Sequence, residues 1–150
     1  MATVIRPEIS EKNKYYIDKH RYYELKHFCL QYKYWKKAYA TCNESIIFAS
    51  NLEKTSSSNV PSDLTAKYAM RRAQYGNKIK LIERLVKETD EYLYPYILKA
   101  VTENLSYTYL KAKLEIPCGR DMYYDRYRKF FWLLSEERDW VAKFTIPFMK

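Results

Sequence analysis

Glycine occurs at only two of the 150 positions, and proline at only five. Because tight turns depend on these residues, the chain has little means of making the many reversals of an all-β fold. Apolar and aromatic residues recur every three or four positions over long stretches, which is the spacing of amphipathic helices. They make up enough of the chain, 47% with alanine and cysteine included, to bury a core. The sequence therefore predicts an all-α protein.

A Ser-rich run, NLEKTSSSNVPSD at residues 51–63, divides this helical patterning in two. It holds almost nothing apolar, so burial cannot offset the entropy cost of ordering it. We therefore predict an aromatic-rich helical region over residues 1–54, a linker over 55–62, a helical domain over 63–140 and a tail over 141–150.

The N-terminal region has a helical pattern from about Asn13, as one long helix or as two with a break near Gln31. Aromatic residues alternate there with lysines, as on surfaces that stack on nucleic-acid bases. These residues are Tyr22, Tyr23, Tyr32, Tyr34 and Trp35, with Lys33, Lys36 and Lys37. Aromatic stripes on amphipathic helices more often pack against other helices, here the C-terminal helices or a second copy of the protein, and we favour this second interpretation.

The pattern of a long amphipathic helix covers residues 63–88, with Gly76 marking a kink or a close helix crossing. Thr89 or Asp90 can cap a helix end in the segment that follows. Pro95 fits the first turn of the next helix, which ends near Asn104, because its missing amide has no partner within a helix at that position.

The chain has a formal net charge of +9, and a surplus of this sign attracts polyanions, most commonly nucleic acid. The charge is spread evenly along the sequence. Residues 1–54 carry ten basic and six acidic side chains, residues 55–106 carry eight and six, and residues 107–150 carry nine and six. A basic patch must therefore come from folding and not from a charge run.

Three cysteines without a CxxC pair and two histidines, His20 and His27, are too few and too scattered for a zinc finger, and no motif for a cofactor occurs. Cys118-Gly-Arg120 has no His or Asp nearby in sequence to activate a thiol, so we expect no enzyme. The odd cysteine count, the absence of a long apolar run and the absence of a signal-like start predict a soluble cytoplasmic protein.

Residues 106–138 have the outline of a helix-turn-helix. Ser106 is a good N-cap for a short helix, Pro117-Cys118-Gly119 forms a turn, and a basic helix begins around Arg120. The residues expected in its core are Leu110, Leu114, Ile116, Tyr123, Tyr127, Phe130 and Leu134.

Placing these residues inward leaves a second set facing outward near the start of the longer helix, where a recognition helix meets base edges. The base-reading candidates are Arg120, Asp121, Tyr124, Asp125 and Arg128. The phosphate-contact candidates are Lys111, Lys113, Arg126 and Lys129. An ordinary helical hairpin with a solvated charged face is the alternative.

Three stretches carry a resemblance to a known family. YYELKHFCLQYKYWKK, the Ser-rich gap and LYPYILKAVTENLSYTYLKAKLEIPCGRDMYYDRYRKFFWLLSEER resemble the RinA/ArpU-type transcriptional regulators of phages of Gram-positive bacteria. The likeness covers most of residues 20–138, and is strongest over Leu93 to Arg138. There the helix-turn-helix is similar in outline to the promoter-reading domain of sigma factors.

The resemblance implies an activator of the late packaging, structural and lysis genes of a phage or prophage. It implies double-stranded DNA as the partner, with host RNA polymerase and a second copy of the chain as further candidates. Glu115 stands where a standard helix-turn-helix has glycine, and Tyr123 follows Leu114 by nine positions instead of about seven. Either the turn is longer, or the second helix is rotated.

Two other functions remain open at this stage. A small packaging subunit similar to terminase would recognise phage DNA through the same kind of motif. An interaction protein would dock its aromatic N-terminal helices on RNA polymerase or another partner without touching DNA.

Overall fold

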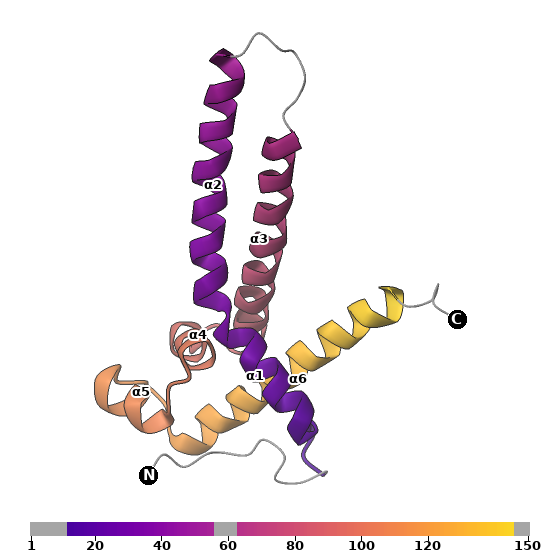
Figure 1. Cartoon of the computed structure of the whole chain (residues 1–150). Helices are drawn as coiled ribbons and strands as arrows, with labels where there is room; N and C mark the ends of the chain where they lie inside the picture. The colour runs from indigo at the N-terminus through magenta and orange to yellow at the C-terminus, as the bar shows by residue number, and fades with distance from the viewer. Residues whose placement is uncertain (1–11, 56–62, 146–150) are drawn as a thin grey trace. The chain divides into compact units, whose positions relative to one another are not determined.

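The computed structural model describes the backbone of residues 12–55 and 63–145, and the side chains of residues 12–52 and 63–139. All regular structure in these residues is α-helical, which confirms the all-α prediction. The helices are α1 (Lys19–Leu30), α2 (Tyr32–Thr55), α3 (Asp63–Thr89), α4 (Tyr94–Glu103), α5 (Tyr107–Lys113) and α6 (Arg120–Thr145), as labelled in Figure 1. None of the described helices combines the length and apolarity that crossing a bilayer requires.

Several helix ends have the local cause that the sequence predicts. The N-terminal helical pattern is split into α1 and α2 at Gln31, so the two-helix alternative holds. Ser106 caps α5, because its hydroxyl accepts a hydrogen bond from the amide of Tyr109 at 3.2 Å. α4 ends at Asn104, which takes the left-handed conformation with φ 56° and donates its amide to the carbonyl of Ala100.

α6 is longer than the sequence pattern suggested. The helix was expected to end near Arg138, with a tail over 141–150, but it continues to Thr145. No glycine or proline interrupts it before Pro147, and the residue before a proline is disfavoured in a helix, so the sequence has its stop signal there. Residues 146–150 of the expected tail, and 56–62 of the expected linker, lie outside the described residues.

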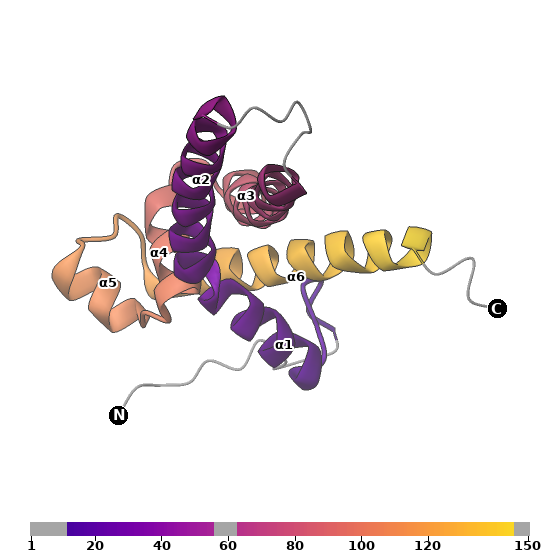
Figure 2. The ribbon, with the colours of Figure 1, turned by 45° about the horizontal axis from the view of Figure 1, so that its top comes forward.

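The chain folds into two compact units that do not follow the division expected from the Ser-rich run. One unit, here called the split unit, consists of Met1–Leu30 and Ile82–Lys150; the other, the hairpin unit, consists of Gln31–Leu81. α1 belongs to the split unit because it packs against α4 and α6 (Figures 1 and 2). A division based on composition along the chain cannot detect such a long-range pairing.

The core of the split unit takes apolar residues from every helix that contributes to it. Aromatic rings from α1 and α6 meet at its centre, where the Tyr22 and Phe131 rings lie 5.1 Å apart edge to face. The buried residues that fill the rest are Leu25 and Cys29, Ile82, Leu85 and Val86, Ile97, Ala100 and Val101, Leu110, and Tyr123, Phe130 and Leu134.

The hairpin unit consists of α2 packed antiparallel to residues 63–81 of α3. Tyr34 contacts Tyr75 edge to face at 6.1 Å, and farther along α2 Asn43 accepts a hydrogen bond from Arg72 at 3.0 Å. A Cβ added at Gly76 would lie 3.2 Å from the Tyr39 ring. Gly76 therefore marks a close helix crossing, one of the two roles that its position inside a helix predicted.

Candidate nucleic-acid interface

The candidate interface is formed by α5, the turn after it and the first turns of α6. Glu115 reverses the chain in the left-handed conformation with φ 54°, at the turn position where a standard helix-turn-helix has glycine. This reversal lets the amide of Ile116 bond to the carbonyl of Leu110 at 3.2 Å. Across the turn, the Tyr107 hydroxyl donates to the carbonyl of Cys118 at 2.8 Å. Hydrogen bonds with α5 therefore hold both the start of the turn, at Ile116, and its end, at Cys118.

The residues expected in the core of this helix pair are inward-facing. The fully buried members are Leu110, Ile116, Tyr123, Phe130 and Leu134, and the half-buried ones are Leu114 and Tyr127. Because Tyr123 is buried as expected, its nine-position separation from Leu114 reflects a longer turn and not a rotated second helix. The same pattern fixes which side of α6 is left for solvent.

Two of the five base-reading candidates are exposed in the first turn of α6. Arg120 and Asp121 both face solvent, and the Arg120 guanidinium lies 5.6 Å from the centre of the Tyr107 ring. Such a ring contact restrains the side chain without neutralising its charge. Met122, which the sequence reasoning missed, is 43% exposed beside them. A cation, a carboxylate and an apolar group are the types that contact guanine, cytosine and the thymine methyl group.

The other three base-reading candidates are only partly exposed. Tyr124 belongs to an aromatic cluster, 4.9 Å from the Tyr123 ring, and burial raises its pKa above the ordinary value. Asp125 forms an ion pair with Arg126 at 2.6 Å. The Nε atom of Arg128 is buried, without a hydrogen-bond partner in the part of the chain that the structure describes. The structure thus separates Arg120 and Asp121 from the rest of the predicted set.

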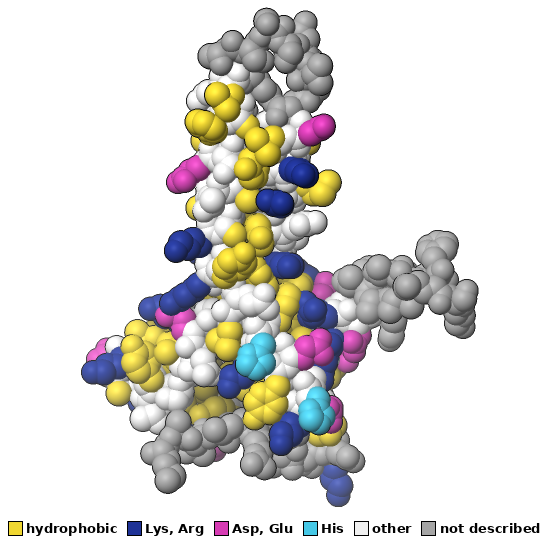
Figure 3. All heavy atoms as spheres, in the orientation of Figure 1, with side chains coloured by type: hydrophobic (Ala, Val, Ile, Leu, Met, Phe, Trp, Pro, Cys, Tyr) yellow, Lys and Arg dark blue, Asp and Glu magenta, His cyan; other side chains and the backbone are white. Residues whose placement is uncertain are grey.

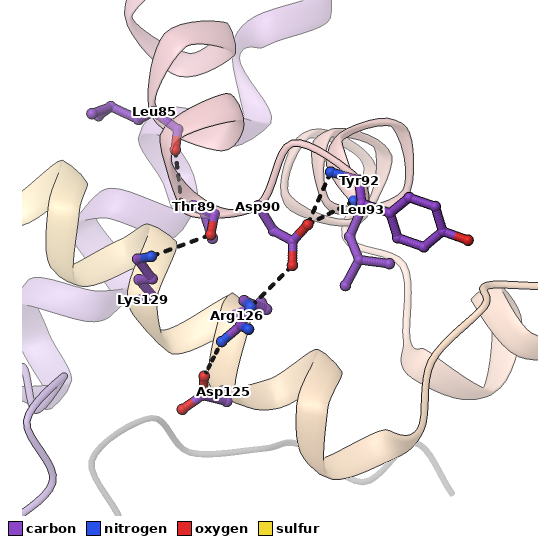
Figure 4. Close-up of polar contacts among 8 residues, drawn as sticks. All are labelled: Leu85, Thr89, Asp90, Tyr92, Leu93, Asp125, Arg126 and Lys129. Atoms are coloured by element: carbon purple, nitrogen blue, oxygen red, sulfur yellow. Dashed lines mark hydrogen bonds and ion pairs between the residues drawn. The ribbon is translucent and has the colours of Figure 1, made fainter.

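The four phosphate-contact candidates also fall into two pairs. Lys111 and Lys113 are exposed on α5, where the ammonium of Lys111 lies 3.5 Å from the carbonyl of Ile116. Arg126 and Lys129 point instead toward the junction between α3 and α4 (Figure 4). Only the α5 pair lies beside the turn with its charge available to solvent.

Asp90, in the junction between α3 and α4, fixes α6 in place. One oxygen of its carboxylate accepts hydrogen bonds from the backbone amides of Tyr92 and Leu93, each at 3.0 Å. The other pairs with Arg126 Nε at 3.0 Å, as Figure 4 shows. Lys129 adds a hydrogen bond from its ammonium to the Thr89 carbonyl at 3.3 Å.

These contacts change the acidity of Asp90. Burial by itself raises the pKa of a carboxyl group, but the amide of Leu93, the Arg126 guanidinium and the amide of Tyr92 together hold the pKa of Asp90 below its ordinary 3.8. The sequence offered a partial signal for this role, since an Asp directly after a helix commonly accepts the next amides. Its pairing with Arg126, 36 positions away, had no such signal.

The thiol of Cys118 lies within the same turn. Burial raises its pKa above the ordinary 9.0, and the nearby Lys111 offsets this only in part. A raised pKa keeps the thiol protonated, whereas a nucleophilic cysteine requires the opposite shift.

No protein-family model matches the chain, and comparison with curated proteins and with solved structures gives no match either.

Proposed function

We propose that the protein binds duplex DNA through α5 and the start of α6, as a sequence-specific activator of phage or prophage late genes. The observation that carries the DNA-reading part is the first turn of α6. Its inner face is anchored by buried Tyr123, while Arg120 and Asp121 remain exposed beside a turn in which Glu115 is left-handed. The regulatory role and the sigma-like character of the pair rest on the family resemblance of the sequence.

In this proposal the roles of the candidate residues are divided. Arg120 reads a guanine and Asp121 either accepts from a cytosine or orients the arginine. Lys111 and Lys113 contact phosphates on either side and hold the register. Arg126 and Lys129 support the reading helix from behind, through Asp90 and the Thr89 carbonyl.

The test is binding to duplexes selected from a random library, measured by fluorescence anisotropy against scrambled duplexes of equal composition. Arg120→Ala should cost about 1–3 kcal/mol on a selected duplex and relax the preference at one base pair. The matched control is Lys99→Ala, because Lys99 is an exposed cation on α4 outside the proposed interface. Equal affinity of the unmodified protein for selected and scrambled duplexes would remove the sequence-specific role.

The regulatory part needs a separate measurement. A reporter placed behind a selected site should be activated by the protein, and Arg120→Ala should reduce that activation in step with its loss of binding. Selected binding without any reporter activation would contradict the activator role while leaving DNA recognition in place.

A further inference from the structure

The net charge of the protein is concentrated in the hairpin unit. Residues 31–81 carry nine basic and three acidic side chains, so six of the nine net positive charges lie there. No Asp or Glu occurs between Glu24 and Glu44, or between Asp63 and Glu83. The even distribution along the sequence therefore conceals two acid-free stretches.

Folding brings these two stretches together. Residues 31–43 of the first lie against residues 71–81 of the second, as the ring contact of Tyr34 with Tyr75 and the hydrogen bond from Arg72 to Asn43 show. We call these two segments the basic half of the hairpin. Its cations are Lys33, Lys36, Lys37, Arg71, Arg72, Lys78 and Lys80.

Three cations of the basic half contact uncharged groups. Lys36 lies 5.3 Å from the centre of the Tyr32 ring, Lys78 lies 5.4 Å from that of Trp35, and Arg72 donates to the Asn43 side chain. In the split unit, by contrast, three arginines form ion pairs with carboxylates: Arg21 with Asp139 at 2.7 Å, Arg84 with Glu137 at 2.6 Å and Arg126 with Asp90 at 3.0 Å. Figure 3 shows dark-blue side chains on both flanks of the lower hairpin.

We propose that the basic half of the hairpin binds the phosphate backbone of nucleic acid without sequence preference. Seven cations without a carboxylate within the same segments form a field that attracts polyanions, and a helix of this length spans about 20 Å, more than half a turn of B-DNA. A second copy of the chain fits this surface less well, because it would bring the same positive charge against it. The exposed rings of Tyr34 and Tyr39, 62% and 36% accessible, also suit stacking on unpaired bases.

The proposal stands independently of the DNA-reading role of α5 and α6. It concerns sequence-independent affinity, which is measured on random duplexes as the slope of log K against log salt. Each phosphate contact contributes about −0.9 to that slope on B-DNA.

The test variant is Lys37→Gln, Arg71→Gln and Lys80→Gln, three exposed cations of the basic half. The control is Lys19→Gln, Lys87→Gln and Lys99→Gln, which removes equal charge from exposed positions of the split unit. The test variant should reduce the magnitude of the slope by about 2–3 and weaken binding at least about tenfold at moderate salt, with a much smaller effect of the control. Circular dichroism of both variants should show the helix content of the unmodified protein.

A charge-preserving variant, Lys37→Arg, Arg71→Lys and Lys80→Arg, should bind random duplex like the unmodified protein. Equal losses in the test and control variants would overturn the proposal, since they would assign the affinity to net charge alone. Binding to vesicles of anionic phospholipid in the absence of any binding to duplex would overturn it as well. Loss of preference for selected duplexes with an unchanged hairpin effect would instead count against the DNA-reading role only.

Discussion

The hydroxyl groups of Tyr22 and Tyr127 lie 2.7 Å apart, and this hydrogen bond joins α1 to α6 across 105 positions of sequence. Tyr22 is only 4% exposed, so its hydroxyl cannot readily exchange this partner for water. A buried hydroxyl without a hydrogen-bond partner destabilises the folded protein more than two hydroxyls bonded to each other. It also destabilises the protein more than two phenyl rings at the same positions.

Replacing one member of this pair should therefore be more damaging than replacing both. Tyr127→Phe alone should lower the free energy of unfolding by about 1–3 kcal/mol, because it leaves the Tyr22 hydroxyl unpaired. Tyr22→Phe with Tyr127→Phe should cost less than the sum of the single changes. Urea denaturation of the unmodified protein, the two single Phe variants and the double variant gives the coupling free energy between the hydroxyls. Strictly additive changes in the free energy of unfolding would show that the hydroxyls do not interact.

The same cluster makes stability sensitive to alkaline pH. Burial raises the pKa of Tyr22, and burial together with Tyr22 raises that of Tyr127, above the ordinary 10.0. The folded protein thus retains protons that the unfolded chain loses, so stability is complete below that value and falls as the pH rises above it. Denaturation midpoints from about pH 8 to about pH 11 should show the fall, and the double Phe variant should show a shallower one. An equal slope in that variant would contradict the assignment.

Asp90 makes stability depend on pH in the opposite direction, so that stability falls as the pH becomes acidic. Because its pKa is held below 3.8 in the folded protein, its contribution is present above that pH and is lost as the pH falls through the folded value. Asp90→Ala should lower the free energy of unfolding at neutral pH by about 2 kcal/mol. Asp90→Asn, which retains an acceptor for the amides of Tyr92 and Leu93, should cost less. Both should flatten the acid side of the stability profile; an unchanged profile would rule out this carboxylate as its source.

Glu115 is expected to be a position where glycine improves the protein. A left-handed residue with a Cβ costs about 1–2 kcal/mol, and the greater entropy of glycine in the unfolded chain returns part of this. Glu115→Gly should therefore raise the free energy of unfolding by about 0.5–1 kcal/mol, and Glu115→Val should lower it. Thermal unfolding of the two variants provides the comparison. The prediction fails if the Gly variant is less stable than the unmodified protein.

Gly76 tests the helix crossing in the hairpin unit. Gly76→Ala should gain up to about 1 kcal/mol of helix propensity, because the Tyr39 ring that a new Cβ would meet is at the surface and can shift. Ala73→Gly, at an exposed site on the same helix, should lose about the same amount. If Gly76→Ala destabilises the protein, the Tyr39 ring cannot move far enough to make room for the added Cβ.

Local signals in the sequence were sufficient for most of the helices. Capping by Ser106, the acceptance of proline in the first turn of α4 at Pro95 and the close crossing at Gly76 all follow from residue chemistry within a few positions. The inward face of α6 followed from the spacing of Tyr123, Phe130 and Leu134, all of which are buried.

Local signals could not predict which residues far apart in the sequence contact each other. Periodicity places Arg126 on an outer face of α6, but it does not reveal that Asp90 neutralises it. Counting charges along the chain likewise treats 31–43 and 71–81 as separate, whereas folding adds their cations together. The location of α1 depends on partners such as Tyr127, which a division at the Ser-rich run assigns to another domain.

The composition of the split unit from two distant segments has a consequence for the order of events during synthesis. Arg21 forms its ion pair with Asp139, 118 positions later, so α1 cannot complete its contacts until most of α6 has emerged from the ribosome. The hairpin unit needs only contacts within residues 31–81, such as the one between Asn43 and Arg72, 29 positions apart, and shorter sequence separation between contacting residues favours faster folding. We expect the hairpin to protect its amides first in pulse-labelled hydrogen exchange. α1, although it precedes the hairpin in the sequence, should be among the last of the described helices to reach its final packing.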